Sequence, residues 1–223
     1  MERQICMEEV SDGRLYGIND MVKADCHDCA GCSACCQGMG SSILLDPLDI
    51  FRLSQHLNRT FEGLLEDKIE LNVVDGVILP NLKMQEDTER CVFLDETGRC
   101  SVHAFRPGIC RIFPLGRIYE NHSFQYFLQV NECKNTSRSK IKVKKWFDTP
   151  DYRKNEQFIT DWHYYLKGLQ KLAENTQDGG LRKEISMYVL NTFYLQAYDP
   201  AEDFYSQFGH RLSLARSNFR RQV

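Results

Sequence analysis

A chain of 223 residues with 42% hydrophobic and 26% charged residues is long enough for one globular domain with a real core. Its net charge of -3 gives no drive toward nucleic acid, and no apolar run reaches the ~18 residues that span a membrane. The first residues also lack the apolar run of a signal peptide, so we expect a cytoplasmic protein with reduced thiols.

Residues 1–24 are polar and are expected to be loosely ordered, with Cys6 alone among them. The following stretch, residues 25–38, reads DCHDCAGCSACCQG and holds half of the chain's ten cysteines. Two-residue spacers between thiols let neighbouring sulfurs converge on one metal ion or one iron–sulfur cluster. In a cytoplasmic chain, such dense spacing favours metal binding over disulfides. The cysteines of this stretch are Cys26, Cys29, Cys32, Cys35 and Cys36.

Two short helices and a hairpin are predicted next along the chain. Asp46 can cap a helix that begins at Pro47, because proline suits the first helical position, and Thr60 can cap a second helix. Asp75-Gly76 lies between two runs rich in β-branched residues, which is a strong hairpin turn signal.

Two further hairpins are predicted beyond residue 90. One pairs Cys91–Leu94 with Cys100–His103, which would place two thiols on adjacent strands. The other pairs residues 115–119 with residues 124–130 around a turn at Asn121-His122. Small hairpins of this kind indicate a β-containing region around the cysteines.

The last third of the chain is expected to be helical. Apolar stripes at helical spacing run through residues 151–219, with a break at Asp178 and a third helix expected to start at Asp199-Pro200. The basic residues between Lys134 and Lys145 are interpreted as a solvated face before these helices and not as a patch for an anionic partner.

Together these elements predict an α+β fold, stapled by metal, with small β-hairpins, irregular cysteine-bearing loops and a mainly helical C-terminal third. We expect residues 1–24 to be a loose segment, residues 25–135 the cysteine-cluster region, and residues 136–223 a helical region packed on it as one compact domain.

More cysteines follow the first stretch, and they indicate that the site is split along the sequence. Arg106 and Arg111 flank the third of them and place positive charge near a thiolate, which would offset the negative charge of a thiolate-rich centre. These later cysteines are Cys91, Cys100, Cys110 and Cys133.

The ordered motifs C-x2-C-x2-C-C, C-x-F-L, G-x-C-S-V and R-P-x2-C-R-x-F-P over residues 27–133 resemble the YkgJ family. Proteins of that family carry a zinc- or iron-chelating cysteine-cluster domain. The resemblance implies a set of metal ligands, with Cys26 and Cys6 as extra cysteines. The implied ligands are Cys29, Cys32, Cys35, Cys36, Cys91, Cys100, Cys110 and Cys133.

These thiols are compatible with zinc sites and with an iron–sulfur cluster of the [4Fe–4S] kind, so they do not identify the metal. Cys26-x2-Cys29-x2-Cys32-x3-Cys36 fits a ferredoxin spacing, although Gln37 stands where that motif has proline. A more distant resemblance to the cysteine module of flagellin lysine methylases, which carries an iron–sulfur cluster, favours iron–sulfur.

We therefore expect the protein to bind a metal ion or a cluster, and two other functional classes remain as alternatives. A cluster-dependent enzyme related to protein-lysine methylases is one alternative, and a thiol redox sensor or electron-transfer protein using Cys35 and Cys36 is another. A protein partner is compatible with any of these, whereas nucleic acid and membrane are not expected as partners. His103 and His27 are expected to play packing or outer roles and not to be ligands.

Overall fold

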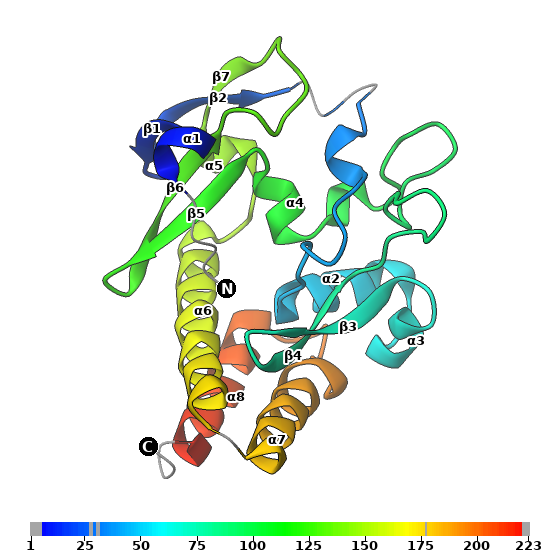
Figure 1. The fold of residues 1–223 in the computed structure, drawn as a ribbon, viewed down its shortest axis with the longest axis vertical. Helices are drawn as coiled ribbons and strands as arrows, with labels where there is room; N and C mark the ends of the chain where they lie inside the picture. The colour runs from blue at the N-terminus through cyan, green and yellow to red at the C-terminus, as the bar shows by residue number, and fades with distance from the viewer. Residues whose placement is uncertain (1–5, 27–28, 30–31, 177, 220–223) are drawn as a thin grey trace. The chain divides into compact units, whose positions relative to one another are not determined.

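The computed structural model describes residues 6–26, 29, 32–176 and 178–219. The chain divides into two compact units (Figure 1). The helical unit consists of residues 44–81 and 153–223, and the cysteine unit consists of residues 2–43 and 82–152. Both units are discontinuous in sequence, so residues 44–81 of the predicted cysteine-cluster region group with the C-terminal helices.

The first helices of the helical unit begin where the sequence predicts. α2 (Pro47–Leu57) starts with a capping box, in which the Asp46 carboxylate accepts from the Asp49 backbone and the Asp49 carboxylate accepts from the Asp46 backbone. α3 (Phe61–Leu65) is capped by the Thr60 hydroxyl, which accepts from Gly63 N at 3.1 Å. Both predicted helix starts are confirmed.

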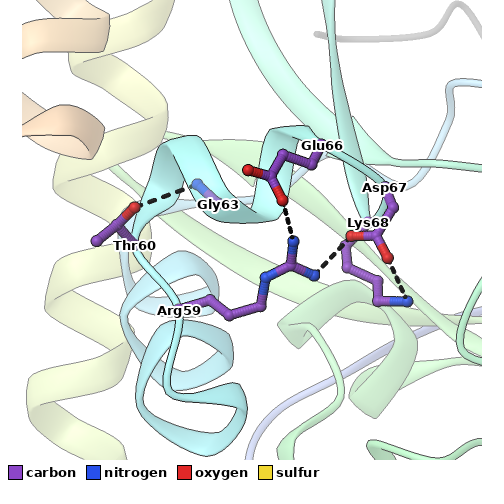
Figure 2. A network of polar contacts seen from close by, with 6 residues as sticks. All are labelled: Arg59, Thr60, Gly63, Glu66, Asp67 and Lys68. Atoms are coloured by element: carbon purple, nitrogen blue, oxygen red, sulfur yellow. Dashed lines mark hydrogen bonds and ion pairs between the residues drawn. The ribbon is translucent and has the colours of Figure 1, made fainter.

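An exposed ion-pair network follows α3 (Figure 2). The Arg59 guanidinium contacts Glu66 at 2.9 Å and Asp67 at 2.6 Å, and Lys68 contacts Asp67 at 3.0 Å. Because water screens these charges, such surface pairs contribute little to stability. The network therefore shapes the local turn and is not a major source of stability.

A hairpin joins the two sequence segments of the helical unit. β3 (Ile69–Val74) pairs with β4 (Val77–Leu82) around Asp75-Gly76, whose positive φ values of 49° and 83° suit this tight turn. The backbone N–H of Ile78 donates to Ser186 Oγ at 3.1 Å, and the Gln170 side chain donates to the Val74 carbonyl at 3.3 Å. The predicted hairpin is confirmed, and its backbone is tied to the helices.

The C-terminal helices supply the apolar core of this unit. They are α6 (Tyr152–Asn175), α7 (Gly179–Leu190), a π-helical continuation η4 (Asn191–Leu195), and α8 (Phe204–Phe219). The last helix starts later than predicted, since the segment around Pro200 forms turns and the Asp203 carboxylate accepts from Ser206 N at 3.0 Å.

In this helical unit, Phe193 is fully buried among aromatic rings of neighbouring helices. Its ring centroid lies 5.0 Å from that of Trp162 and 5.8 Å from that of Phe208. The buried Tyr194 hydroxyl donates to the Leu45 carbonyl at 3.0 Å, which satisfies a polar group that would otherwise be costly in the core.

Small antiparallel sheets form the framework of the cysteine unit. β1 (Ser11–Tyr16), β6 (Ser123–Gln129) and β5 (Leu115–Glu120) make a sheet in that order. β2 (Met21–Asp25) pairs with β7 (Ser139–Lys142), and Figure 1 shows these strands side by side. The predicted hairpin after residue 115 is confirmed as β5 and β6.

The N-terminal segment that the sequence predicts to be loosely ordered contains strands. After α1 (Met7–Val10), β1 and β2 follow in turn, and β2 buries Val22 and Ala24 almost completely. Each strand is stabilised by a partner more than a hundred residues away, and such a long-range partner leaves little trace in local sequence. α5 (Val143–Trp146) follows β7, and the Trp146 indole donates to the Ile112 carbonyl at 3.1 Å.

The cysteine-bearing loops contain little regular structure. They carry the 3-10 turns η2 (Ala34–Cys36) and η3 (His103–Phe105) and the short helix α4 (Gly108–Ile112). The predicted strands at Cys91–Leu94 and Cys100–His103 are wrong, because that region forms turns with an isolated bridge between Leu94 and Cys100.

The fold is therefore mixed α+β, with small antiparallel sheets in the cysteine unit and mainly helical structure toward the C-terminus. Among the described residues, no helix combines the length and apolar character needed to cross a membrane.

Candidate metal centre

The β2–β7 ladder brings the first and the last cysteine segments together. Asp25 lies opposite Ser139 in this ladder, and the Ser139 hydroxyl donates to the Asp25 carboxylate at 2.9 Å. Just beyond the strands, the Asn135 side chain donates to the Cys26 carbonyl at 3.5 Å. The backbone near Cys133 is thereby held beside the start of the first cysteine stretch.

A second connection joins the first cysteine stretch to the middle of the chain. The backbone N–H of Cys91 donates to the Cys36 carbonyl at 2.8 Å, and that of Gly38 donates to the Glu89 carbonyl at 2.9 Å. These bonds surround an antiparallel bridge between Gln37 and Arg90. Cysteines more than fifty residues apart in sequence are placed on adjoining backbone.

Cys91 and Cys100 begin turns of the same kind. The Cys91 carbonyl accepts from Leu94 N at 2.9 Å, and the Cys100 carbonyl accepts from His103 N at 3.2 Å. Within each turn, the backbone N–H two residues after the cysteine donates to its sulfur, from Phe93 and Val102 respectively. Such donors stabilise a thiolate, which is the form that binds metal.

Cys133 has an equivalent backbone donor. The N–H of Asn135, again two residues later, donates to the Cys133 sulfur. This recurrence at cysteines of separate segments indicates that the loops are shaped to hold thiolates. Hydrogen bonds of this kind orient metal ligands and tune the metal they hold.

The thiols interact electrostatically across these segments. Cys26 Sγ lies 3.3 Å from Cys29 Sγ, and the adjacent thiols of Cys35 and Cys36 are hydrogen-bonded to each other. Further interactions connect these thiols to those of the later cysteines. We call this set the thiol network; its members are Cys26, Cys29, Cys32, Cys35, Cys36, Cys91, Cys100 and Cys133.

Cys35 has the most connections in the thiol network. It interacts with Cys36 and Cys26 in its own stretch, and it also acts on Cys29, Cys91 and Cys100. Cys133 interacts with Cys26 and Cys32. The later cysteines thus interact with several positions of the first cysteine stretch.

Hydrogen bonding and burial shift the pKa values of these thiols. The bond from Cys29 lowers the pKa of Cys26 to about 6, and the same bond raises the pKa of Cys29. The bond to Cys36, together with burial, raises the pKa of Cys35. Burial raises the pKa of Cys91 and Cys100 as well. Without a cation, these groups cannot all be thiolates together.

Two arginines place positive charge among the thiols. Arg106 acts on Cys29 and Cys100, and Arg138 acts on Cys133. The Nε atom of Arg106 and the Nε and Nη1 atoms of Arg138 are buried without a hydrogen-bond partner. Buried donor nitrogens without a partner are costly, so these atoms are suited to an anionic group beside them.

The other arginine and the histidines predicted near the site have different surroundings. The Arg111 guanidinium donates to the Ala104 carbonyl at 2.6 Å. Arg106 Nη1 lies 2.9 Å from His103 Nδ1, so that imidazole already has a polar neighbour. His27 lies outside the described residues.

The thiol network overlaps with the predicted ligand set. All members of the thiol network except Cys26 are predicted ligands, and the remaining one, Cys110, is half-buried on α4. Cys6 is exposed, as befits a cysteine outside the motif. Within the described residues, no three His, Cys, Asp or Glu side chains already converge on the position of one metal ion.

Cys26 is the residue that sequence reasoning set aside and the structure places within the thiol network. The signal for it is its position three residues before Cys29, which repeats the spacing of the motif. The resemblance to a family pattern that begins at Cys29 obscured this signal. Arg138 was also interpreted as part of a solvated face, whereas two of its nitrogens are buried.

Comparisons with known proteins agree with this chemistry. A family model named CxxCxxCC and described as "Putative zinc- or iron-chelating domain" matches residues 28–146, which is more than half of the chain. No curated protein and no solved structure matches the chain. Since the matched region contains every cysteine of the thiol network except Cys26, the chain belongs to the CxxCxxCC family of zinc- or iron-chelating domains.

Proposed function

We propose that this chain binds an iron–sulfur cluster of the [4Fe–4S] kind through cysteine thiolates drawn from separate segments. The observation that carries the proposal is the thiol network, in which Cys35 interacts with thiols before and after it in the sequence. The proposed ligands come from Cys29, Cys32, Cys35, Cys36, Cys91, Cys100, Cys110 and Cys133.

The residues present fit such a group. Cysteine thiolates are the usual ligands of iron–sulfur clusters, and backbone N–H donors to the sulfurs tune the reduction potential. The network has such donors at Cys91, Cys100 and Cys133. A cluster bound by four thiolates carries net negative charge, which supplies the anionic partner that the buried nitrogens of Arg106 and Arg138 require. When bound, the cluster would supply one-electron transfer or a Lewis-acidic iron.

Zinc is a second candidate, and one distance favours it. Two thiolates on one tetrahedral zinc lie about 3.8 Å apart, given Zn–S bonds of roughly 2.3 Å. The 3.3 Å between Cys26 Sγ and Cys29 Sγ is close to that separation. On a cubane cluster, thiolates bind different irons and lie further apart. Zinc bound by four thiolates would be a closed structural site.

Anaerobic purification with metal and acid-labile sulfide analysis tests the proposal. We expect a brown protein in which iron and sulfide are present in equal amounts, with an absorption band that bleaches on reduction. A colourless protein that retains zinc and no sulfide would contradict the iron–sulfur proposal and establish the second candidate. A protein that retains neither metal would contradict both.

The charge of Arg138 is expected to matter for metal retention. Arg138→Gln removes the positive charge that faces Cys133, so we expect metal affinity to fall about 10–100-fold, as outer-shell substitutions commonly do. Competition with a chromophoric chelator measures the change. Lys140→Gln is the matched control, because Lys140 is exposed in the same basic stretch. Equal loss in both variants would assign the effect to general charge and not to the site.

A further inference from the structure

Cys26 lies outside the region that the family model matches, and it is also absent from the ligand set that the sequence resemblance implies. The structure nevertheless brings it into interaction with two other thiols. Cys26 Sγ lies 3.3 Å from Cys29 Sγ, and Cys133 interacts electrostatically with Cys26. From this geometry we propose that Cys26 is an additional metal ligand of this chain, acting together with Cys29 and Cys133. This inference rests on the proposed function.

The surroundings of Cys26 distinguish it from a cysteine that merely fills the core. Its side chain is 4% exposed, which by itself suits either a packing role or a ligand. It also contacts the thiol of Cys29 and interacts electrostatically with Cys133. A packing cysteine has no need of thiols from two other positions. A soft metal ion needs this arrangement.

Backbone pairing helps to set the position of Cys26. It directly follows β2, whose Val22 and Ala24 are 1% and 0% exposed. Asp25 pairs with Ser139 across the β2–β7 ladder, and the Asn135 side chain holds the Cys26 carbonyl. The ladder therefore helps to hold Cys26 in place, and a ligand held by backbone pairing loses less conformational freedom on binding.

The spacing of the cysteines in the sequence also favours Cys26 as a ligand. Cys26, Cys29 and Cys32 follow one another at every third position, and Cys32 also interacts with Cys133. Four thiols from the two ends of the cysteine unit are thus associated with one another. Their number is the number of thiolates that one tetrahedral ion takes. Cys35 interacts with Cys26 and Cys29 of this set and also with Cys91 and Cys100.

Substitution of Cys26 tests the proposal, with Cys6 as the matched control. Cys6 is the other cysteine outside the implied ligand set, and it is exposed. We expect Cys26→Ser to lower metal affinity at least about tenfold and to change the visible or X-ray absorption spectrum, because one sulfur ligand is replaced. Cys6→Ser is expected to leave both unchanged. A Cys26→Ser protein with wild-type metal content, affinity and spectrum would overturn the proposal.

Thiol labelling of the unmutated protein provides a second measurement if Cys26→Ser fails to fold. Iodoacetamide is added before and after metal removal, and the modified cysteines are identified by mass spectrometry. We expect Cys26 to be protected in the loaded protein and modified after chelation, whereas Cys6 is modified in both. If Cys26 were protected both before and after metal removal, or modified both before and after it, the result would assign Cys26 no role in metal binding. A wild-type protein without any metal would instead contradict the proposed function itself.

Discussion

Metal removal is expected to open the cysteine loops to hydrogen exchange while the helical unit stays protected. The backbone of the cysteine loops is held by isolated bridges and turns. The helical unit, in contrast, has long helices around a core of aromatic rings. In the loops, the backbone is joined by bonds such as those from Cys91 N to the Cys36 carbonyl and from Ser101 N to the Phe93 carbonyl. The amides of Gly38, Cys91 and Ser101 should therefore lose protection on chelation.

The size of the expected effect follows from the strength of metal–thiolate bonding. One structural zinc contributes about 10–16 kcal/mol to folding in small peptides, whereas a whole domain is stable by about 5–15 kcal/mol. Loss of the metal also leaves buried thiols and the unpaired nitrogens of Arg106 and Arg138 without compensation. Local opening of the loops is the expected response.

The division of the chain into two units makes this test selective. From sequence, chelation is predicted to unfold residues 26–133 more than the C-terminal helices. The structure narrows that range, because residues 44–81 belong to the helical unit. Amides of α2 and β4, such as those of Leu53 and Leu79, should stay as protected as those of α6. If the amides of Leu53 and Leu79 lost protection together with that of Cys91 after chelation, and regained it when the metal was added back, the two units would not respond independently to the metal.

Local signals predicted much of the fold. The starts of α2 and α3 depend on Asp46 and Thr60, whose side chains bond backbone groups within three residues. The turn at Asp75-Gly76 is likewise local, because the required φ values are intrinsic to those residue types. Features of this kind can be predicted from a few adjacent residues.

Long-range pairing was beyond sequence reasoning. β1 and β2 lie in a polar segment without a strong strand pattern, and their partners are β6 and β7. The late start of α8 is a different case, since Pro200 suits a helix start but the side chain that caps the helix is Asp203. Both outcomes reflect tertiary context overriding local preference.

In the candidate site, too, local features could be predicted from the sequence and long-range contacts could not. The spacing of the cysteines in the sequence identified a cysteine-cluster domain, which the family match over residues 28–146 supports. It did not show that Cys35 interacts with Cys91 and Cys100 as well as with Cys26, or that Cys133 interacts with Cys26 and Cys32. That grouping depends on the β2–β7 ladder and on the bridge at Gln37, which are made between distant segments.

Truncation of Phe193 is expected to destabilise the helical unit strongly without affecting metal content. Phe193 is fully buried, and its ring lies 5.0 Å from Trp162, 5.6 Å from Tyr165 and 5.8 Å from Phe208 between centroids. Phe193→Ala removes those contacts and leaves a cavity, which costs about 3–5 kcal/mol. Urea denaturation followed by circular dichroism measures the loss, and metal analysis of the folded variant accompanies it.

Phe193→Leu is the matched control for that variant. A leucine retains most of the apolar volume, so the expected cost falls below about 1.5 kcal/mol. If chelation opens the cysteine loops and Phe193→Ala weakens the helices, each change acts on the unit in which its contacts lie. A Phe193→Ala protein that loses its metal while its helices remain folded would contradict this separation. Such a result would show that the aromatic core supports the thiol network, even though no residue of that network lies in the helical unit.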